Sequence, residues 1–258
     1  MLFSLIGNFV VNTGVKEFVK APRPIGTPGL ESMRVSTATG YSFPSGHTQT
    51  ATAFWTNLIV LIRQSWVYVL GIIMIISVGI SRLYLGVHWP IDVAFGWLFG
   101  ILFSIVFIKI FDYVDENKKY WILILLLIVF AIIGYLINSE SYIEYFGILT
   151  GFVIGYIVED KFINFDNTKK NRKTTIFSRN SKYENKPIII LKKFTIGIVS
   201  LGLVYVLLKS TYYIIPKYFE IKNFETYSVI SNYIKYLLTV FYAVAGVPLL
   251  FKYLNLED

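Results

Sequence analysis

The chain has 258 residues, of which 55% are hydrophobic and 17% aromatic, and its mean hydropathy is +0.60. This composition is too apolar for a soluble domain and indicates a protein embedded in a bilayer. The chain has no cysteine, which excludes disulfides, cysteine-based zinc sites and a cysteine nucleophile. Most of the net charge of +8 lies in one polar segment, so membrane orientation explains it and no nucleic-acid partner is expected.

Apolar stretches close to the ~20 residues needed to cross a bilayer recur along almost the whole chain. They predict an all-α fold, a polytopic bundle of transmembrane helices. The stretch at 48–63 is semi-polar because it contains Thr48, Gln49 and Asn57, and we expect it to face protein and not lipid. The predicted spans are residues 1–18, 48–63, 66–85, 91–111, 121–138, 143–158, 194–215 and 233–251.

The distribution of Lys and Arg predicts how the chain crosses the membrane. Residues 159–193 carry many basic and few acidic side chains, so we expect a solvated linker on the cytoplasmic side. Counting spans back from this linker places residues 20–43 and the neighbourhood of His88 on the outer face. Basic residues at the start of that outer segment, Lys16 and Arg23 among them, run against the charge rule, and we attribute them to a bound anion.

The same reading divides the chain into four parts. These are a catalytic membrane core at 1–111, an additional transmembrane pair at 112–158, the basic linker at 159–193 and a C-terminal transmembrane pair at 194–258. Every polar cluster described below lies in the first part.

Three clusters of polar residues lie where a predicted span meets the outer face. The first contains Lys16, Arg23 and Pro24, with the two cations presented by an ending helix and an extended loop. Arg offers a bidentate fork to phosphate oxygens and Lys a point charge, so the pair suits a phosphate dianion. The alternative is that both side chains snorkel to the membrane interface.

The second cluster, Pro44 to His47, directly precedes the semi-polar span. Ser45 can cap a helix, and Gly46 lets backbone N–H groups approach an anion at the helix N-terminus. A protonated His47 beside a phosphate would donate to a leaving oxygen as a general acid. The alternative is an ordinary helix cap followed by an interfacial histidine.

The third cluster runs from Ser81 and Arg82 to His88 and Asp92. Pro90 suits the first position of a helix, which places Asp92 about one turn beyond His88. A carboxylate bonded to one ring nitrogen leaves the other nitrogen of His88 free to attack phosphorus, and Arg82 supplies a further phosphate clamp. The alternatives are a helix-end charge for Asp92 and a snorkelling side chain for Arg82.

The chain has only two histidines, and both lie in these clusters on one predicted membrane face. The joint occurrence of the three clusters favours a single phosphate site over three unrelated structural roles. Two histidines and one nearby aspartate are few metal ligands, and the surrounding Lys and Arg side chains would repel a cation. We therefore expect metal-independent chemistry with no cofactor.

The three clusters resemble the signature of the type 2 phosphatidic acid phosphatase family, PAP2, which reads KxxxxxxRP, PSGH and SRxxxxxHxxxD. The corresponding segments are Lys16 to Pro24, Pro44 to His47 and Ser81 to Asp92, and every defining position matches. The resemblance implies a PAP2-like helical core and an acid phosphatase that acts through a phosphohistidine. It also implies a multi-pass protein of the bacterial cytoplasmic membrane, with its site facing outward.

The resemblance further implies a role for each matching residue. It makes His88 the nucleophile, His47 the acid that protonates the leaving group and Asp92 the group that orients His88. The implied phosphate-binding residues are Lys16, Arg23, Ser45, Gly46 and Arg82. The implied substrate is a lipid phosphate or pyrophosphate, such as undecaprenyl pyrophosphate, phosphatidylglycerol phosphate or phosphatidate, and the motif does not choose among them.

Bacterial membrane members of that family usually have two spans before the first motif, whereas this chain starts inside the first-motif helix, so we expect leading helices to be missing. One alternative is a lipid phosphotransferase that uses His88 with an acceptor hydroxyl in place of water. Another is a truncated, non-catalytic membrane protein that binds lipid. Vanadate-dependent haloperoxidases share the signature, but they are soluble and the hydropathy disfavours them. The sequence predicts no oligomeric state.

Overall fold

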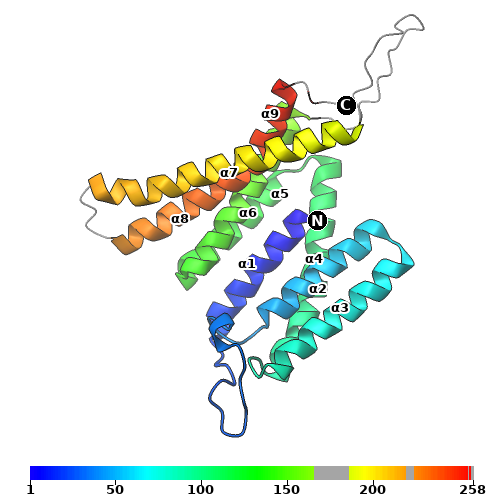
Figure 1. The fold of residues 1–258 in the computed structure, drawn as a ribbon, viewed down its shortest axis with the longest axis vertical. Helices are drawn as coiled ribbons and strands as arrows, with labels where there is room; N and C mark the ends of the chain where they lie inside the picture. Colours follow the sequence, from blue (N-terminus) through cyan, green and yellow to red (C-terminus); the bar gives the residue numbers. More distant parts are fainter. Residues whose placement is uncertain (166–185, 219–223, 255, 257–258) are drawn as a thin grey trace, which may run out of the picture. The chain divides into compact units, whose positions relative to one another are not determined.

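The computed structural model describes residues 1–165, 186–218, 224–254 and 256, and secondary structure in this part of the chain is helical (Figure 1). The all-α fold that hydropathy predicts is therefore confirmed. The chain forms two compact units, Met1–Leu149 and Thr150–Asp258, and the boundary lies within a helix. Most of the expected basic linker, residues 166–185, lies outside the described residues.

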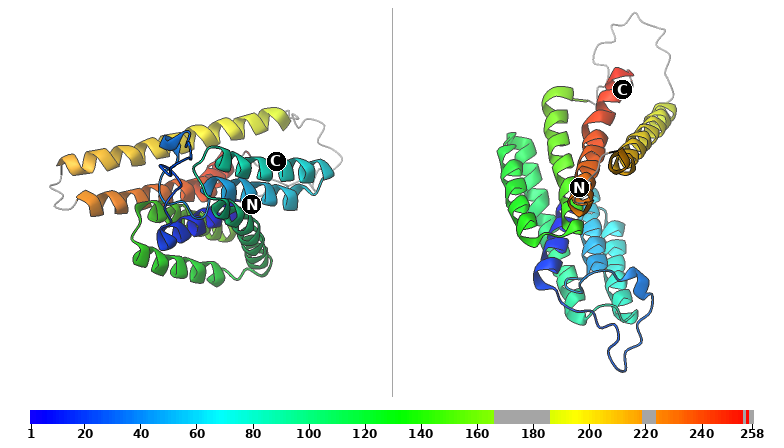
Figure 2. Two further views of the ribbon diagram at one scale, coloured as in Figure 1. Left: turned by 90° about the horizontal axis from the view of Figure 1, so that it is seen from below. Right: turned by 90° about the vertical axis from the view of Figure 1, so that its left-hand side faces the viewer.

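The first unit is a bundle in which consecutive helices run antiparallel and are joined by short turns and one long loop. Helix α2 packs against α1, α3 and α4, so it is the central helix of the unit. Figures 1 and 2 show that the α1–α2 loop and the α3–α4 turn lie at the same end of this unit. The helices are α1 (Leu2–Val19), α2 (Gly46–Ile62), α3 (Ser65–Tyr84), α4 (Pro90–Asn117), α5 (Trp121–Ile137) and the start of α6 (Glu140–Val158), with a 3₁₀ turn at Val35–Thr37.

Small residues let α2 and α4 approach closely. A Cβ atom at Gly96 would lie 2.9 Å from the Cβ of Thr48, and one at Gly100 would lie 2.6 Å from the Cβ of Thr52. Glycines spaced four apart lie on one face of a helix, and such pairs promote close packing between membrane helices. This packing holds the N-terminal end of α2 against the N-terminal end of α4.

The interface between α1, α2 and α4 is polar. Asn12 Nδ2 donates to Gln49 Oε1 at 2.8 Å, and Gln49 Nε2 donates to Asn8 Oδ1 at 3.2 Å. Further along, Asn57 Nδ2 donates to Ser4 Oγ at 3.0 Å. All five side chains are buried, so the expectation that the semi-polar span faces protein is confirmed. Interhelical hydrogen bonds of this kind stabilise bundles where lipid offers no partner.

Helix α5 and the start of α6 form a hairpin that packs beside α1. Tyr142 is 1% exposed, and its hydroxyl donates to the carbonyl of Phe130 at 3.0 Å. Its ring lies against Gly14 of α1 and Gly134 of α5, where added Cβ atoms would be 3.2 Å and 2.9 Å away. The start of α6 is thereby fixed to α1 and α5.

The second unit contains the rest of α6 and two long helices. Helix α7 begins at Lys186 rather than at residue 194, because hydropathy detects only the apolar part of a helix. Helix α8 likewise begins at Phe224 rather than at residue 233. The elements of this unit are the π-helical turn Glu159–Ile163, α7 (Lys186–Tyr218), α8 (Phe224–Phe241), a second π-helical turn Tyr242–Gly246 and α9 (Val247–Tyr253).

Helices long and apolar enough to cross a membrane occur in both units, as expected for a multi-pass membrane protein. Helix α5 is apolar but shorter, and α1 and α2 carry the polar side chains that bury against each other. Among the described residues, the spanning candidates are Ser65–Tyr84, Pro90–Asn117, Glu140–Ile163, Ile189–Tyr218 and Thr226–Tyr253.

Candidate active site

The three sequence clusters meet at one end of the first unit. Lys16 lies in the last turn of α1, and Arg23 lies in the loop that follows. His47 lies in the first turn of α2, and His88 lies in the turn between α3 and α4. Short connections and antiparallel packing bring these elements to the same end of the bundle, as Figure 1 shows.

A cavity of about 380 Å³ lies among these elements. Its lining includes five of the predicted residues, which are Lys16, Arg23, Gly46, His47 and His88. The other lining residues that matter below are Phe9, Asn12, Thr13, Thr50 and Tyr145. The described lining contains two cations, two histidines and no carboxylate, so the cavity favours an anion.

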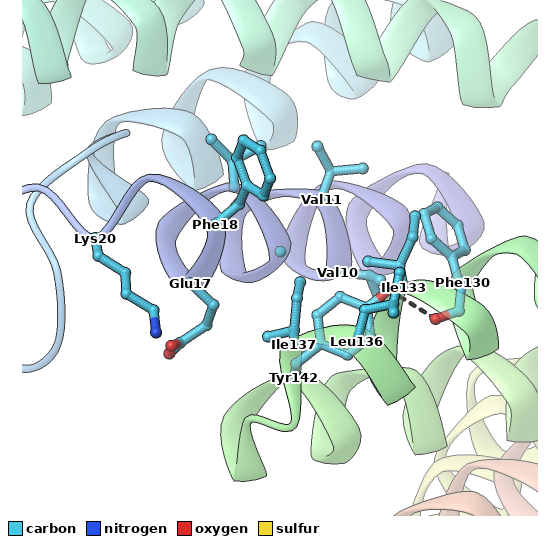
Figure 3. Close-up of a pocket in the computed structure, with 12 residues that line it drawn as sticks. Val10, Val11, Glu17, Phe18, Lys20, Phe130, Ile133, Leu136, Ile137 and Tyr142 are labelled. Carbon is cyan, nitrogen blue, oxygen red and sulfur yellow. Dashed lines mark hydrogen bonds between the residues drawn. The ribbon is translucent and has the colours of Figure 1, made fainter.

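A larger cavity of about 650 Å³ lies on another face of α1, against α5 and the start of α6. Figure 3 shows that apolar side chains such as Val10, Ile133 and Leu136 line most of it, with Glu17 and Lys20 at one end. It contains neither histidine, so size alone does not indicate where the chemistry occurs.

His88 is held between a carboxylate and a guanidinium. Its Nδ1 atom lies 3.3 Å from Asp92 Oδ2, and its Nε2 atom lies 3.0 Å from Arg23 Nη1. Because a guanidinium only donates, Nε2 must be the unprotonated ring nitrogen, which leaves the Nδ1 proton for Asp92. The residue is 5% exposed. The geometry therefore selects the tautomer in which Nε2 carries the lone pair.

Asp92 is fixed by more than His88. The backbone N–H of Trp89 donates to Asp92 Oδ2 at 2.8 Å, as expected where Pro90 starts the helix and Asp92 closes a capping box. The hydroxyl of Ser42 also donates to Oδ2, and it lies 3.3 Å from His88 Nδ1. Ser42 is fully buried and contacts both Asp92 and His88, so it helps to orient His88. The sequence analysis did not identify it.

The environment lowers the pKa of His88 below its usual range. Burial is the main cause, and the positive charges of Arg23 and Lys16 act in the same direction. The hydrogen bond to Asp92 and the charge of that carboxylate oppose the shift. His88 therefore stays neutral to a lower pH than a free histidine, which is the state that a nucleophile needs.

The two cations are anchored to the loop that precedes α2. Arg23 Nε donates to the carbonyl of Gly40 at 2.9 Å, and its Nη2 donates to that of Thr39 at 2.8 Å. Arg23 Nη1 also donates to the carbonyl of Val87 at 2.9 Å. Lys16 Nζ donates to the carbonyl of Tyr41. These bonds fix the positive charge beside Nε2 of His88.

The N-terminus of α2 contributes differently at each position. Gly46 lines the cavity, and a Cβ there would lie 3.3 Å from Asn12 Oδ1. His47 lines the cavity and is exposed. Ser45 is fully buried, and its hydroxyl bonds that of Thr48 at 2.9 Å while its N–H donates to the carbonyl of Asp92. Its contact with phosphate therefore stays a prediction.

Arg82 is outside the lining of the cavity. It lies in the last turn of α3, and its Nε donates to the hydroxyl of Ser81 at 3.2 Å. Its contact with phosphate likewise stays a prediction.

The sequence analysis missed Ser42, which contacts Asp92 and His88, and Tyr145, which lines the cavity. Ser42 precedes the second motif by two positions, so proximity to Pro44 was the available signal. Tyr145 reaches the cavity through the packing of α6 beside α1, and no motif marks it.

Two family descriptions match the chain. One, PAP2 superfamily, matches residues 1–116, and the other, PAP2 superfamily phosphatase, transmembrane extension, matches residues 143–258. Together they cover most of the sequence, and no solved structure matches it significantly.

Curated relatives match shorter segments. The chain is 43% identical over 72 residues to an undecaprenyl-diphosphatase of Sulfolobus acidocaldarius, covering 28% of this chain and 34% of that protein. It is 34% identical over 112 residues to sphingosine-1-phosphate phosphatase 1 of Rattus norvegicus, covering 41% and 26%. It is 30% identical over 120 residues to phosphatidylglycerophosphatase B of Bacillus subtilis, covering 43% and 55%. The matches span from a quarter to just over half of these relatives.

Proposed function

This chain belongs to the PAP2 superfamily, and we propose that it is a membrane phosphatase that hydrolyses a lipid phosphate or pyrophosphate through a phosphohistidine on His88. The observation that carries the proposal is the position of His88 Nε2, 3.0 Å from Arg23 Nη1 in a cavity lined by cations, with Nδ1 directed to Asp92. A neutral imidazole so oriented can attack a phosphorus atom whose oxygens are bound by the cations. The names of the relatives support phosphorylated lipids as substrates.

In the first step, the Nε2 lone pair of His88 forms a bond to phosphorus. The bond between phosphorus and the lipid oxygen, or the bridging oxygen of a pyrophosphate, breaks, and its electron pair stays on that oxygen. Protonated His47, which lines the cavity and is exposed, supplies the proton. The imidazole becomes cationic, and Asp92 at Nδ1 stabilises that charge.

In the second step, water attacks the phosphohistidine. Neutral His47 accepts a proton from the water as the new oxygen–phosphorus bond forms. The nitrogen–phosphorus bond breaks, its electron pair returns to Nε2, and inorganic phosphate leaves. Both histidines are then in their starting states, so the cycle needs no further reactant.

Positive charge supplies most of the catalysis in this scheme. Phosphoryl transfer depends chiefly on positioning and on stabilising charge that spreads over the equatorial oxygens. Lys16 and Arg23 are beside the nucleophile, and the N-terminus of α2 at Gly46 presents backbone N–H groups. Ser45 and Arg82 are included as phosphate ligands on the strength of the matching signature.

The proposed location is the outer face of the cytoplasmic membrane. The excess of Lys and Arg between residues 159 and 193 supports a cytoplasmic position for that segment. Counting crossings back from it puts the His88 end of the first unit outside. A lipid at that face reaches the cavity without crossing the bilayer.

The experiment is phosphate release in detergent with EDTA, comparing the wild type with His88→Ala on undecaprenyl pyrophosphate, phosphatidylglycerol phosphate and phosphatidate. We expect metal-free release by the wild type and a loss of at least about 10³-fold in the variant. A pulse of radiolabelled lipid quenched in alkali should also leave label on the wild-type chain, because phosphohistidine survives alkali and not acid. Release that persists in the variant would overturn the mechanism, and no release by folded wild type would overturn the function.

The same assay separates hydrolysis from phosphotransfer. Adding a lipid with a free hydroxyl to the reaction gives a phosphotransferase an acceptor in place of water. Hydrolysis predicts unchanged inorganic phosphate, whereas transfer predicts a phosphorylated acceptor and a matching fall in phosphate.

A further inference from the structure

The catalytic cavity has an uncharged wall as well as a cationic one. Phe9 of α1 and Tyr145 of α6 line it together with Thr13 and Thr50. The rings of Phe9 and Tyr145 are stacked, with centroids 5.3 Å apart and planes 7° from parallel. A stacked pair presents a rigid apolar surface at small cost in side-chain entropy. The cavity can therefore contact more of a substrate than its phosphate.

Tyr145 differs from the tyrosine one turn before it. Tyr142 is buried, and its hydroxyl donates to the carbonyl of Phe130. Tyr145 is partly exposed to the cavity, and among the residues that the structure describes none hydrogen-bonds its hydroxyl. A tyrosine hydroxyl with its ring fixed by stacking is available to a ligand.

Tyr145 and the proposed catalytic residues lie in segments matched by two different family descriptions. The catalytic residues lie within residues 1–116, whereas Tyr145 lies in the transmembrane extension matched at 143–258. The start of α6 is fixed to α1 by the packing of Tyr142 against Gly14, so Tyr145 is held at the cavity. The extension thus supplies part of the cavity wall.

We propose that Tyr145 and Phe9 bind the uncharged segment that joins the phosphate to the apolar chain of the lipid, so that the transmembrane extension takes part in substrate selection. The proposal rests on the proposed function, since it assigns a place to the lipid part of that substrate. The described lining contains no Asp or Glu and includes Lys16 and Arg23, so it disfavours an ammonium group near the phosphate. The favoured class is therefore a glycerol or prenyl phosphate rather than an amino-alcohol phosphate.

The test compares Tyr145→Leu and Tyr145→Phe with a matched control, Tyr135→Leu. Tyr135 lies on α5 and is 86% exposed, so its substitution removes the same atoms away from the cavity. The substrates are phosphatidate and undecaprenyl phosphate, in which uncharged atoms join the phosphate to the apolar chain, and sphingosine 1-phosphate, all in mixed micelles. Inorganic phosphate is the competitive inhibitor, and the dephosphorylated lipid is measured so that added phosphate does not interfere.

We expect Tyr145→Leu to raise KM for the two uncharged-linker lipids by roughly tenfold, because the wall contacts bound substrate. The inhibition constant of inorganic phosphate should not change, because phosphate alone does not contact Tyr145 or Phe9. Tyr145→Phe keeps the aromatic ring and loses only the hydroxyl, so it should raise KM less than Tyr145→Leu does. Tyr135→Leu should have the KM of the wild type. Wild-type kcat/KM should be lowest for sphingosine 1-phosphate.

Two results would overturn the inference while leaving the proposed function intact. One is an unchanged KM in Tyr145→Leu, and the other is a phosphate inhibition constant that rises by the same factor as KM, which would mean a general disturbance of the site. A wild type that releases no phosphate from these lipids, from undecaprenyl pyrophosphate or from phosphatidylglycerol phosphate would instead overturn the proposed function itself.

Discussion

Helix α2 buries polar side chains, whereas α7 exposes apolar ones, although both belong to a membrane protein. The buried residues of α2 include Gln49 and Asn57, which bond across to α1. In α7, by contrast, side chains such as Leu203 and Leu207 are more than half exposed. In lipid, an exposed apolar side chain costs nothing and a buried polar one has to be paired. A buried polar side chain therefore indicates either a packed helix interface or a site, whereas an exposed apolar side chain indicates neither.

Asp92 provides the strongest test of that comparison. Asp92→Asn keeps the shape of the side chain but removes the charge that stabilises the His88 cation and fixes its tautomer. We expect kcat to fall by about 10³- to 10⁴-fold, by analogy with a serine-protease triad in which the same change was made. Initial rates of phosphate release would measure it.

Asp112, exposed near the other end of α4, gives the matched control. Asp112→Asn makes the same chemical change on the same helix and should leave the rate within a factor of about two. Similar losses in both variants would mean that charge along α4, rather than the pairing with His88, controls activity.

Arg23 tests the cationic side of the cavity. Arg23→Ala removes the donor to His88 Nε2 and a nearby positive charge, and we expect kcat/KM to fall by about 10²-fold. The pKa of His88 should rise, since Arg23 is one of the charges that lower it. The active neutral form is then lost at a higher pH on acidification, so the acidic limb of the pH profile moves upward.

Nuclear magnetic resonance can follow this titration directly, because the chain has only two histidines and His47→Asn leaves His88 alone. Arg63→Ala, which removes the same charge at the opposite end of α2, is the control and should not move the His88 pKa. A His88 pKa that falls in Arg23→Ala would contradict the electrostatic account.

Ser42 should have a smaller effect, because it acts through Asp92. Losing a hydrogen bond to a charged group costs about 1.5–3 kcal/mol, so Ser42→Ala should lower kcat roughly tenfold or more and leave KM unchanged. Exposed Ser65 offers a control, Ser65→Ala, that should change neither constant. A change in the ¹⁵N shifts of His88 in Ser42→Ala would show positioning, and unchanged shifts with a raised KM would contradict it.

Much of this site could be predicted from the sequence, because its residues lie at helix ends with defined spacing. The interval from His88 to Asp92 is one helical turn, and the structure has Nδ1 and Oδ2 3.3 Å apart. The bounds of α1, α2, α3 and α5 were predicted within two residues, whereas α4 continues to Asn117, beyond the predicted end of its span at residue 111. The polar starts of α7 and α8 escaped detection, since hydropathy does not register a helix that extends beyond its apolar part.

The rest depends on contacts between segments distant in sequence. Ser42 contacts Asp92 because the long loop between α1 and α2 folds back against the first turn of α4. A serine in a loop gives no sequence signal of such a contact. Tyr145 reaches the cavity only because Gly14 and Gly134 allow the ring of Tyr142 to pack closely beside α1. A sequence pattern identifies site residues whose partners are near in sequence. Residues such as Ser42 and Tyr145 join the site through tertiary packing, which the pattern does not reveal.

The smallest expected effect comes from replacing a glycine in each unit, because one glycine is closely packed and the other has open space beside it. Gly100 of α4 faces α2, where an added Cβ would lie 2.6 Å from the Thr52 Cβ. Among the residues that the structure describes, and apart from the backbone of α7 itself, no atom lies within 4 Å of a Cβ added at Gly202 of α7. Gly100→Ala should therefore lower the free energy of unfolding by about 1–2 kcal/mol through overpacking. Gly202→Ala should be neutral or stabilising by up to about 1 kcal/mol, because alanine has the higher helix propensity.

The measurement is the midpoint of thermal unfolding in detergent, followed by tryptophan fluorescence. Activity below the midpoint distinguishes the two effects further, because displacement of α2 from α4 also shifts the N-terminus of α2 at the cavity, so Gly100→Ala should lose activity before it unfolds. Equal midpoints for the two variants would mean that α2 and α4 are not in close contact in the membrane protein. A large loss of stability in Gly202→Ala would mean instead that the exposed face of α7 is covered by protein and not by lipid.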